Sequence, residues 1–206
     1  TNEAKDVYTF TLRDNARWSD GNPVTAHDFV YAWRRLADPA TGSPYSWFAD
    51  IMALENVGAV MSGELGPEAL GIRALDNHTL EVRLTASLPY FAAMTTHAST
   101  FPSPQWAVRT FGNDWTKPGN IVGNGAYVLT EHIPNETATR ERNSLYWNND
   151  ATIIDKVVTL VINDENTDLT RWQAGETDKG AVPSGQYPRL KAEYPDEAIS
   201  FPRLCT

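Results

Sequence analysis

The sequence has few of the features that mark special classes of protein. It contains a single cysteine in 206 residues, and a chain of this length buries roughly 70% of its unfolded surface, so it needs no disulfide or metal to fold. No run approaches the ~18 apolar residues that cross a bilayer. Residues 1–6 carry neither the basic nor the apolar stretch of a signal peptide. We therefore expect the chain as given to be soluble. The sequence is also compatible with an earlier leader that has been removed.

Basic residues are in the minority. The chain has 17 Lys and Arg against 26 Asp and Glu, a formal net charge of −9 that is spread along the sequence. Such a surface repels phosphate backbones, and there is no basic patch with interleaved aromatic residues. We therefore expect no nucleic-acid partner.

The one cysteine, Cys205, allows two interpretations. It is a small buried apolar side chain, or it is half of a disulfide whose partner lies outside this chain. A nucleophilic role is not favoured, because nothing nearby in the sequence would lower the pKa of the thiol.

The first forty residues predict a strand and a helix. Residues 7–12 alternate and are rich in β-branched and aromatic side chains, which indicates a strand. Thr25 and Asp28 have the spacing of a capping box, and Asp38-Pro39 is a stop signal. A helix is therefore predicted between them, with an apolar face formed by Phe29, Trp33 and Leu36.

A second, long amphipathic helix is predicted over residues 47–61, because apolar residues recur there at intervals of three and four. They are Trp47, Ile51, Leu54, Val57 and Met61. Residues 67–70 then predict one helical turn, and residues 72–75 and 79–84 predict a β-hairpin.

Two prolines mark short helices in the middle of the chain. Pro89 and Pro104 are each expected in a first helical turn, the second capped by Ser103 and ended at Gly112. Because two prolines within three residues stiffen a crossing segment, the stretch Phe101–Pro104 is the predicted domain boundary.

The last eighty residues predict strands followed by helices. Strands are expected over 126–133, 137–142, 157–162 and 199–205, and the strongly apolar third strand is expected to be buried on both faces. Helices are expected over 165–174, with Gly175 as the C-cap, and over 187–193.

No motif for catalysis or metal binding stands out. Four scattered histidines lack metal-ligand spacing, the G-x-S-x-G pattern is absent, and the glycine-rich residues 119–125 lack the Lys-Ser/Thr pair of a P-loop. Carboxylates are plentiful, but no spacing singles out a glycosidase pair. Most of the seven tryptophans are expected to pack in the core, including Trp33, Trp47 and Trp172.

Several motifs in fixed order carry a resemblance that covers almost the whole chain. The segments are Tyr8-Thr9-Phe10-Thr11-Leu12-Arg13; Arg17-Trp18-Ser19-Asp20-Gly21-Asn22-Pro23; Ser43-Pro44-Tyr45; Leu75-Asp76-Asn77-His78-Thr79-Leu80; Trp115-Thr116-Lys117-Pro118-Gly119-Asn120-Ile121-Val122-Gly123-Asn124-Gly125-Ala126-Tyr127; Gly175-Glu176-Thr177-Asp178; and Leu204-Cys205-Thr206. Together they resemble the peptide-binding extracellular solute-binding proteins of family 5, the periplasmic receptors of oligopeptide ABC importers.

The resemblance implies a mixed α/β (α+β) fold of the periplasmic binding protein-like class II, present in part. Members of the family are much longer, so the chain is expected to be the N-terminal-side piece of a two-lobed receptor. Residues 1–102 would form most of the extra α/β domain and residues 103–206 the central part of the first lobe. In relatives with a cysteine at the position of Cys205, it pairs with one in the second lobe.

The resemblance also implies a ligand site. Tyr45 matches a tyrosine that faces the bound peptide, although the same residue type at the start of a helix is also compatible with simple burial. Gly180 and Ala181 lie where the first lobe contacts peptide, and here they offer backbone contacts at best.

The implied function is peptide binding without catalysis, with delivery to the membrane subunits of an ABC permease in the periplasm of a Gram-negative bacterium. No cofactor and no metal is expected. A receptor of the same family for murein peptide, dipeptide, haem or a metal chelate is an alternative, and a carboxylate-based glycoside hydrolase is a remote one. Exposed lobe-facing apolar surface is expected to favour self-association of this chain.

Overall fold

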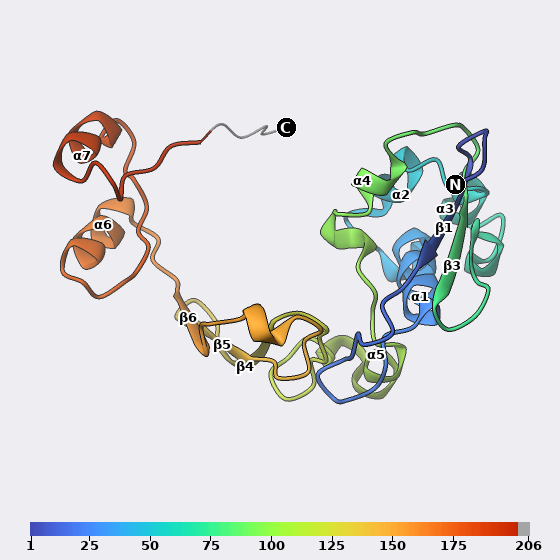
Figure 1. Ribbon diagram of the computed structural model, residues 1–206, viewed down its shortest axis with the longest axis horizontal. Coiled ribbons are helices and arrows are strands. Elements are labelled where there is room, and N and C mark those ends of the chain that lie inside the picture. Colours follow the sequence, from blue (N-terminus) through green and yellow to red (C-terminus); the bar gives the residue numbers. More distant parts are fainter. Residues whose placement is uncertain (202–206) are drawn as a thin grey trace. The chain divides into compact units, whose positions relative to one another are not determined.

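The computed structural model describes residues 1–201 (Figure 1). The chain divides into two compact units. The first contains Thr1–His132 and Thr139–Val157, and the second contains Ile133–Ala138 and the chain from Val158 onward. The division into family domains at residue 102 concerns a larger receptor and stays a prediction.

A three-stranded antiparallel sheet forms one layer of the first unit. Its strands are β1 (Val7–Thr11), β2 (Ile72–Ala74) and β3 (Thr79–Arg83), in the order β1-β3-β2. Tyr8 is paired with Val82, and these two side chains and Leu80 are buried. The strand and hairpin predicted from the alternating pattern are confirmed.

Helix α1 (Ala26–Ala37) lies against β2 and β3 (Figure 1). Its capping box is present: Asp28 accepts a hydrogen bond from the backbone N–H of Thr25 at 2.7 Å, while the Thr25 side chain accepts one from the first turn. Trp33 is 2% exposed, and its indole N–H donates to the carbonyl of Thr100. The helix predicted from capping and periodicity is therefore confirmed.

The long helix predicted over residues 47–61 is wrong. The structure has two short helices, α2 (Ser46–Ile51) and α3 (Val57–Met61), separated by Ala53 and Asn56 with positive φ. Leu54 forms a β-bridge with Leu84, and the backbone N–H of Glu55 donates to the carbonyl of Arg83. This pairing with the end of β3 draws residues 53–55 out of helical conformation.

As a consequence, the apolar face predicted for that helix is only partly buried. Leu54 and Val57 are in the core, but Trp47 is 52% exposed and Ile51 is 50% exposed. The core position predicted for Trp47 is wrong because the face of α2 that packs on the core carries Phe48 and Ala49.

Two further short helices belong to the first unit, α4 (Phe91–Met94) and α5 (Gln105–Phe111). Tyr90 is the N-cap of α4, so Pro89 precedes the helix instead of lying in its first turn. Pro104 is itself the N-cap of α5, and no side chain caps the helix, so the predicted role of Ser103 is wrong. The predicted end at Gly112 is confirmed.

A second sheet has the order β4-β5-β6, from β4 (Tyr127–Ile133), β5 (Thr137–Arg142) and β6 (Lys156–Leu160). The three strands match three of the predicted ones. The prediction that the third is buried on both faces is wrong, since Val158 is 50% exposed and Val161 is 45% exposed. Within residues 1–201 the sheet has three strands, and no other element covers the side chains of Val158 and Val161.

Two helices dominate the second unit, α6 (Glu165–Gln173) and α7 (Tyr187–Glu193), close to the predicted ranges. Ala174 is the C-cap of α6, and Gly175, at φ 74°, follows it. Leu169, Leu190 and Ala198 form the small core. Residues 199–201 are not a strand, and the rest of the strand predicted to Cys205 lies outside the described residues.

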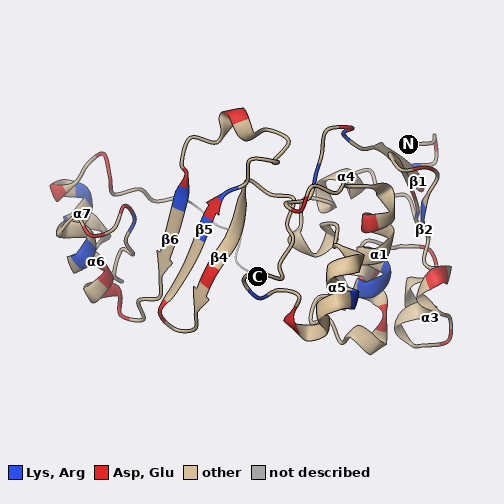
Figure 2. Ribbon diagram, turned by 90° about the horizontal axis from the view of Figure 1, so that it is seen from below, with Lys and Arg blue, Asp and Glu red and all other residues tan. Residues whose placement is uncertain are grey.

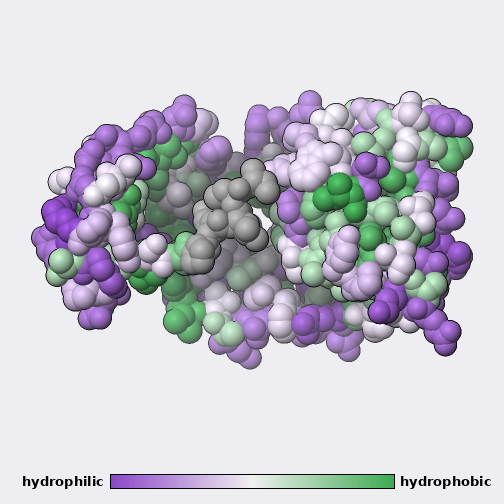
Figure 3. Space-filling view, turned by 90° about the horizontal axis from the view of Figure 1, so that it is seen from above, coloured by the Kyte–Doolittle hydropathy of each residue, from purple (hydrophilic) through white to green (hydrophobic). Residues whose placement is uncertain are grey.

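None of the helices formed by residues 1–201 is both long enough and apolar enough to cross a membrane. Figure 3 shows hydrophobic atoms at the surface of both units. Among the most exposed apolar side chains are Ile153, Ile199 and Phe201.

Candidate functional site

Tyr45, the first residue predicted to contact a ligand, lies at the N-cap of α2 and is 48% exposed. Its ring centroid is 6.1 Å from that of Trp47 and 5.4 Å from that of His97. The alternative of a buried tyrosine is therefore excluded. The structure presents Tyr45 as one member of an exposed group of rings.

His97 connects this group of rings to the core. Its ring stacks on Phe48, with centroids 4.1 Å apart and planes 20° apart, and Phe48 is buried. The backbone N–H of Ser99 donates to Nδ1 of His97 at 3.2 Å, and the hydroxyl oxygen of Ser99 lies 2.8 Å from the same atom, so these contacts orient the ring. Sequence reasoning passed over His97, since no local pattern links it to Tyr45, which lies more than fifty residues earlier.

Gly180 and Ala181, the other predicted contact residues, lie in the second unit. They line a cavity of about 530 Å³ between α6, α7 and the chain that follows each helix. Its lining consists of Leu169, Trp172, Asp178, Lys179, Gly180, Ala181, Val182, Leu190, Tyr194, Glu197, Ala198, Ile199 and Phe201. The volume falls in the range of small-molecule sites.

Close packing holds the Gly180 segment against α6. A Cβ atom at Gly180 would lie 2.9 Å from Cβ of Trp172, so only glycine fits without displacement. The backbone N–H of Ala181 donates to Oδ2 of Asp168 at 2.7 Å. Because that N–H is engaged within the chain, a ligand at Ala181 would have to use other atoms of the segment.

The start of α6, the helix on which the Gly180 segment packs, is fixed by its own cap. The N-cap Asp164 accepts hydrogen bonds from the hydroxyl and the backbone N–H of Thr167, both at 2.8 Å. These bonds, the hydroxyl bond first, hold the pKa of Asp164 below its ordinary value. The carboxylate stays ionised and keeps its place at the positive end of the helix.

Aromatic side chains supply much of the apolar wall. The rings of Trp172 and Tyr194 meet edge to face with centroids 4.9 Å apart. Trp172 packs on the core of Leu169 and Leu190, as its helical position predicted, and also faces the cavity. Tyr194 was not singled out from the sequence, because it lies at the end of α7, where periodicity gives no signal.

Charged groups stand at the rim of the same cavity. Asp178, Lys179 and Glu197 bring charges of both signs to it. Such a lining combines apolar area with polar groups that could orient a ligand. Within residues 1–201, no three His, Cys, Asp or Glu side chains are placed to hold a metal ion. Cys205 lies outside the described residues.

The sequence model for "Bacterial extracellular solute-binding proteins, family 5 Middle" matches residues 1–205. The periplasmic oligopeptide-binding protein OppA of Salmonella typhimurium is 47% identical over 99% of this chain, and the periplasmic murein peptide-binding protein MppA of Escherichia coli is 44% identical over 97%. This chain spans 38% and 37% of the length of those two relatives.

A solved structure agrees with these matches. The structure of Haemophilus influenzae OppA in complex with the peptide RPPGFSPFR is 44% identical, with a TM-score of 0.90. The match covers 94% of this chain and 38% of that one. Fold and sequence therefore point to the same relatives, and the mixed α/β fold of a partial periplasmic binding protein is confirmed.

Proposed function

This chain belongs to the bacterial extracellular solute-binding proteins of family 5, and we propose that it is part of a receptor that binds oligopeptides and delivers them to an ABC permease. The observation that carries the proposal is the 47% identity to the Salmonella oligopeptide-binding protein over 99% of the chain. We place the receptor in the periplasm of a Gram-negative bacterium, as the names of the Salmonella and E. coli relatives suggest.

The proposed ligand follows from the H. influenzae relative, which was solved with the peptide RPPGFSPFR. A receptor for peptides of varied sequence relies on backbone hydrogen bonds and terminal charges, since all peptides share them. The exposed ring of Tyr45 and the cavity beside Gly180 and Ala181 are the proposed contact points of this chain.

The remainder of the binding site is proposed to lie outside this chain, which spans about two fifths of the relatives' length. In the proposed receptor, residues 1–102 form most of the extra α/β domain and residues 103–206 the central part of the first lobe. The second lobe closes over the peptide and holds the partner cysteine of Cys205. Such a disulfide suits an oxidising compartment.

We propose binding without catalysis. The three relatives named above are all binding proteins, which supports this role, and a glycoside hydrolase has no such support. A receptor for murein peptide is the second candidate, because the E. coli murein peptide-binding protein is 44% identical to this chain.

A chimera tests the proposal. Residues 1–206 replace the matching segment of the Salmonella relative, and calorimetry measures binding of tripeptides to pentapeptides, RPPGFSPFR and murein tripeptide. We expect the chimera to bind oligopeptides within about tenfold of the parent relative, whereas the isolated chain binds at least about a hundredfold more weakly, because it lacks closure around the ligand. Preference for murein tripeptide would favour the second candidate.

Two outcomes would refute this assignment. A folded chimera that binds no peptide would contradict the peptide-receptor role of these residues, provided that its thermal midpoint matches the parent's. Tight 1:1 binding by the isolated chain would contradict the proposal that the site needs a second lobe.

Exposed apolar side chains support self-association as a further property of the isolated chain. Ile153 is 87% exposed, and Ile199 and Phe201 are 68% and 67% exposed. Apolar groups left in water favour association. We expect sedimentation velocity to show concentration-dependent dimers or larger species, and a monomer at high concentration would contradict this.

A further inference from the structure

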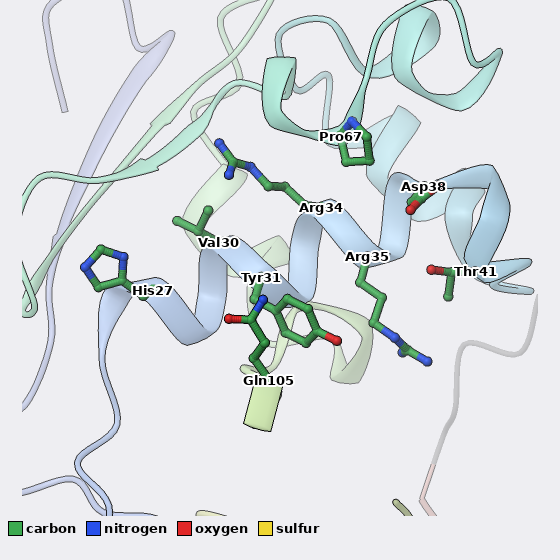
Figure 4. Close-up of a pocket in the computed structure, with 9 residues that line it drawn as sticks. All are labelled: His27, Val30, Tyr31, Arg34, Arg35, Asp38, Thr41, Pro67 and Gln105. Atoms are coloured by element: carbon green, nitrogen blue, oxygen red, sulfur yellow. The ribbon is translucent and has the colours of Figure 1, made fainter. Parts of the chain in front are cut away.

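The outward face of α1 forms the floor of an open groove in the first unit. Its volume is about 430 Å³, and its walls come from Pro67 on one side and Gln105, on α5, on the other (Figure 4). The side chains on the floor are His27, Val30, Tyr31, Arg34, Arg35 and Asp38, and Thr41 closes one end. None of them belongs to the proposed peptide contacts.

Arg34 and Arg35, which are consecutive in the sequence, give this groove its positive charge. Ion pairs link other cations to carboxylates, but in the described part of the chain neither Arg34 nor Arg35 lies within 4.0 Å of a carboxylate. This is notable in a chain with nine more acidic than basic residues. Figure 2 shows the basic segment of α1 near the Arg-bearing end of α5.

The hydrogen bonds of the two arginines leave donors available. Nη2 of Arg34 donates to the carbonyl of Glu68 at 3.1 Å, and its Nε is buried without an acceptor within residues 1–201, so contact with a partner falls to the remaining Nη donors. The guanidinium of Arg35 lies 5.9 Å from the ring centroid of Trp115, at the limit of a cation–π contact. A favourable interaction with the C-terminal end of the helix explains why the helix tolerates both arginines, but it uses none of their N–H groups.

Among residues 1–201, the groove is lined by one carboxylate, that of Asp38, and this carboxylate already accepts a hydrogen bond. The side chain of Asp38 caps the turn that follows α1 and accepts a hydrogen bond from the backbone N–H of Ala40 at 2.9 Å. The hydrogen-bond partner of the Asp38 side chain therefore lies in the turn that Asp38 itself begins. Two guanidinium groups against one carboxylate leave the lining with a net positive charge, which matches an anionic partner.

The shape of the groove selects an extended partner over a compact anion. Arg34 leaves α1 on the side of Pro67, while Arg35 leaves it on the side of Tyr31 and Gln105, so the two groups do not converge on one point (Figure 4). From His27 to Asp38 the helix rises by roughly 16 Å, a length that about five residues of extended chain would cover.

We propose that this groove is a docking site for an extended acidic segment of a partner protein, with Arg34 and Arg35 as its main contacts. Charge-assisted hydrogen bonds from guanidinium groups to carboxylates are strong and directional. Because the chain as a whole is acidic, the attraction is local to the two guanidinium groups, and added salt would weaken it. This site does not depend on the proposed peptide-binding function.

The test uses a fluorescent hexaglutamate peptide with acetylated and amidated ends, so that no terminal charge can engage a peptide-receptor site. Anisotropy should show binding to the 206-residue chain at about 20 mM salt that weakens strongly at about 300 mM salt. Hexaglutamine should not bind. The double variant Arg34→Gln, Arg35→Gln should weaken binding about tenfold or more.

The matched control is Arg73→Gln, Arg83→Gln, which removes the same charge from exposed arginines on the sheet of the same unit and should change affinity less than about twofold. If the arginine variant at the groove is destabilised, Arg35→Glu alone serves, since the side chain of Arg35 makes no hydrogen bond within residues 1–201 that anchors the fold. Equal losses in the groove and control variants, no binding at low salt, or equal binding of a hexanucleotide would each overturn the proposal.

Discussion

Phe48 and His97 stack face to face, with ring centroids 4.1 Å apart, although they lie 49 positions apart in the sequence. Phe48 belongs to α2 and is buried, whereas His97 precedes a helical turn and contacts the ring of Tyr45. The stack therefore connects an exposed candidate ligand contact to the core. His97 thus contacts both the exposed ring of Tyr45 and the buried ring of Phe48.

Replacing Tyr45 separates ligand contact from folding. Because the ring is half exposed, we expect Tyr45→Ala to change the free energy of unfolding by less than about 1 kcal/mol, as at other surface positions. In the chimera described above it should weaken peptide binding about tenfold. Tyr90→Ala is the control, since Tyr90 is 60% exposed and outside the ring group. Calorimetry and urea unfolding measure the two effects, and equal affinity for both variants would remove Tyr45 from the site.

Asp28 is expected to be the most sensitive polar residue of α1. It is 6% exposed, and it accepts hydrogen bonds from the backbone of Thr25 and the indole of Trp18. We expect Asp28→Ala to destabilise the chain by about 2–3 kcal/mol, because it removes the cap and leaves a buried indole N–H without its acceptor. The exposed Asp50→Ala serves as control, within about 0.5 kcal/mol of wild type by urea unfolding. A similar result for both variants would contradict the role of the capping box.

Glu81 should make stability depend on pH in the acid range. The guanidinium of Arg73, with a further contribution from Arg83, lowers the pKa of its carboxyl in the folded chain. The folded state therefore binds this proton less readily than the unfolded state does, so the stabilisation is present above about pH 4.3 and is lost as the pH falls through the folded pKa. Thermal midpoints between about pH 6 and pH 3 should fall less steeply for Glu81→Gln. An unchanged profile would contradict the prediction.

Gly180 should tolerate no side chain. A Cβ atom added at this position would lie 2.9 Å from Cβ of Trp172, an atom next to the backbone that cannot swing away. We expect Gly180→Ala to destabilise the second unit by about 1–3 kcal/mol, as overpacking does. Gly58→Ala is the contrasting control: Gly58 lies within α3 with open space around it, so alanine should stabilise by up to about 1 kcal/mol. Destabilisation by both variants would show that the tight fit at Gly180 is not the cause.

Most helices and strands could be predicted because the signals that specify them lie within a few residues of each element. The capping pair Thr25 and Asp28 and the alternation of residues 7–12 each specify an element without help from distant parts of the chain. The break between α2 and α3 could not be predicted in this way. It arises because residues 53–55 pair with residues 83–85. The spacing of apolar residues in a helix carries no information about such a long-range backbone pairing.

The candidate site shows the same division. Tyr45, Gly180 and Ala181 were found only through the family resemblance, and the structure exposes the first and places the other two at one cavity. His97 and Tyr194 were not predicted. Their roles depend on contacts with Phe48 and Trp172, which no spacing in the sequence encodes.

The backbone bonds between residues 53–55 and 83–85 also bear on motion. They fasten the chain directly after α2 to the end of β3, while α2 itself carries Tyr45 at its start. Amide protons on both sides of this junction should exchange with solvent at similar, slow rates, because one side cannot open without the other. Tyr45 is therefore expected to move together with the sheet of the first unit.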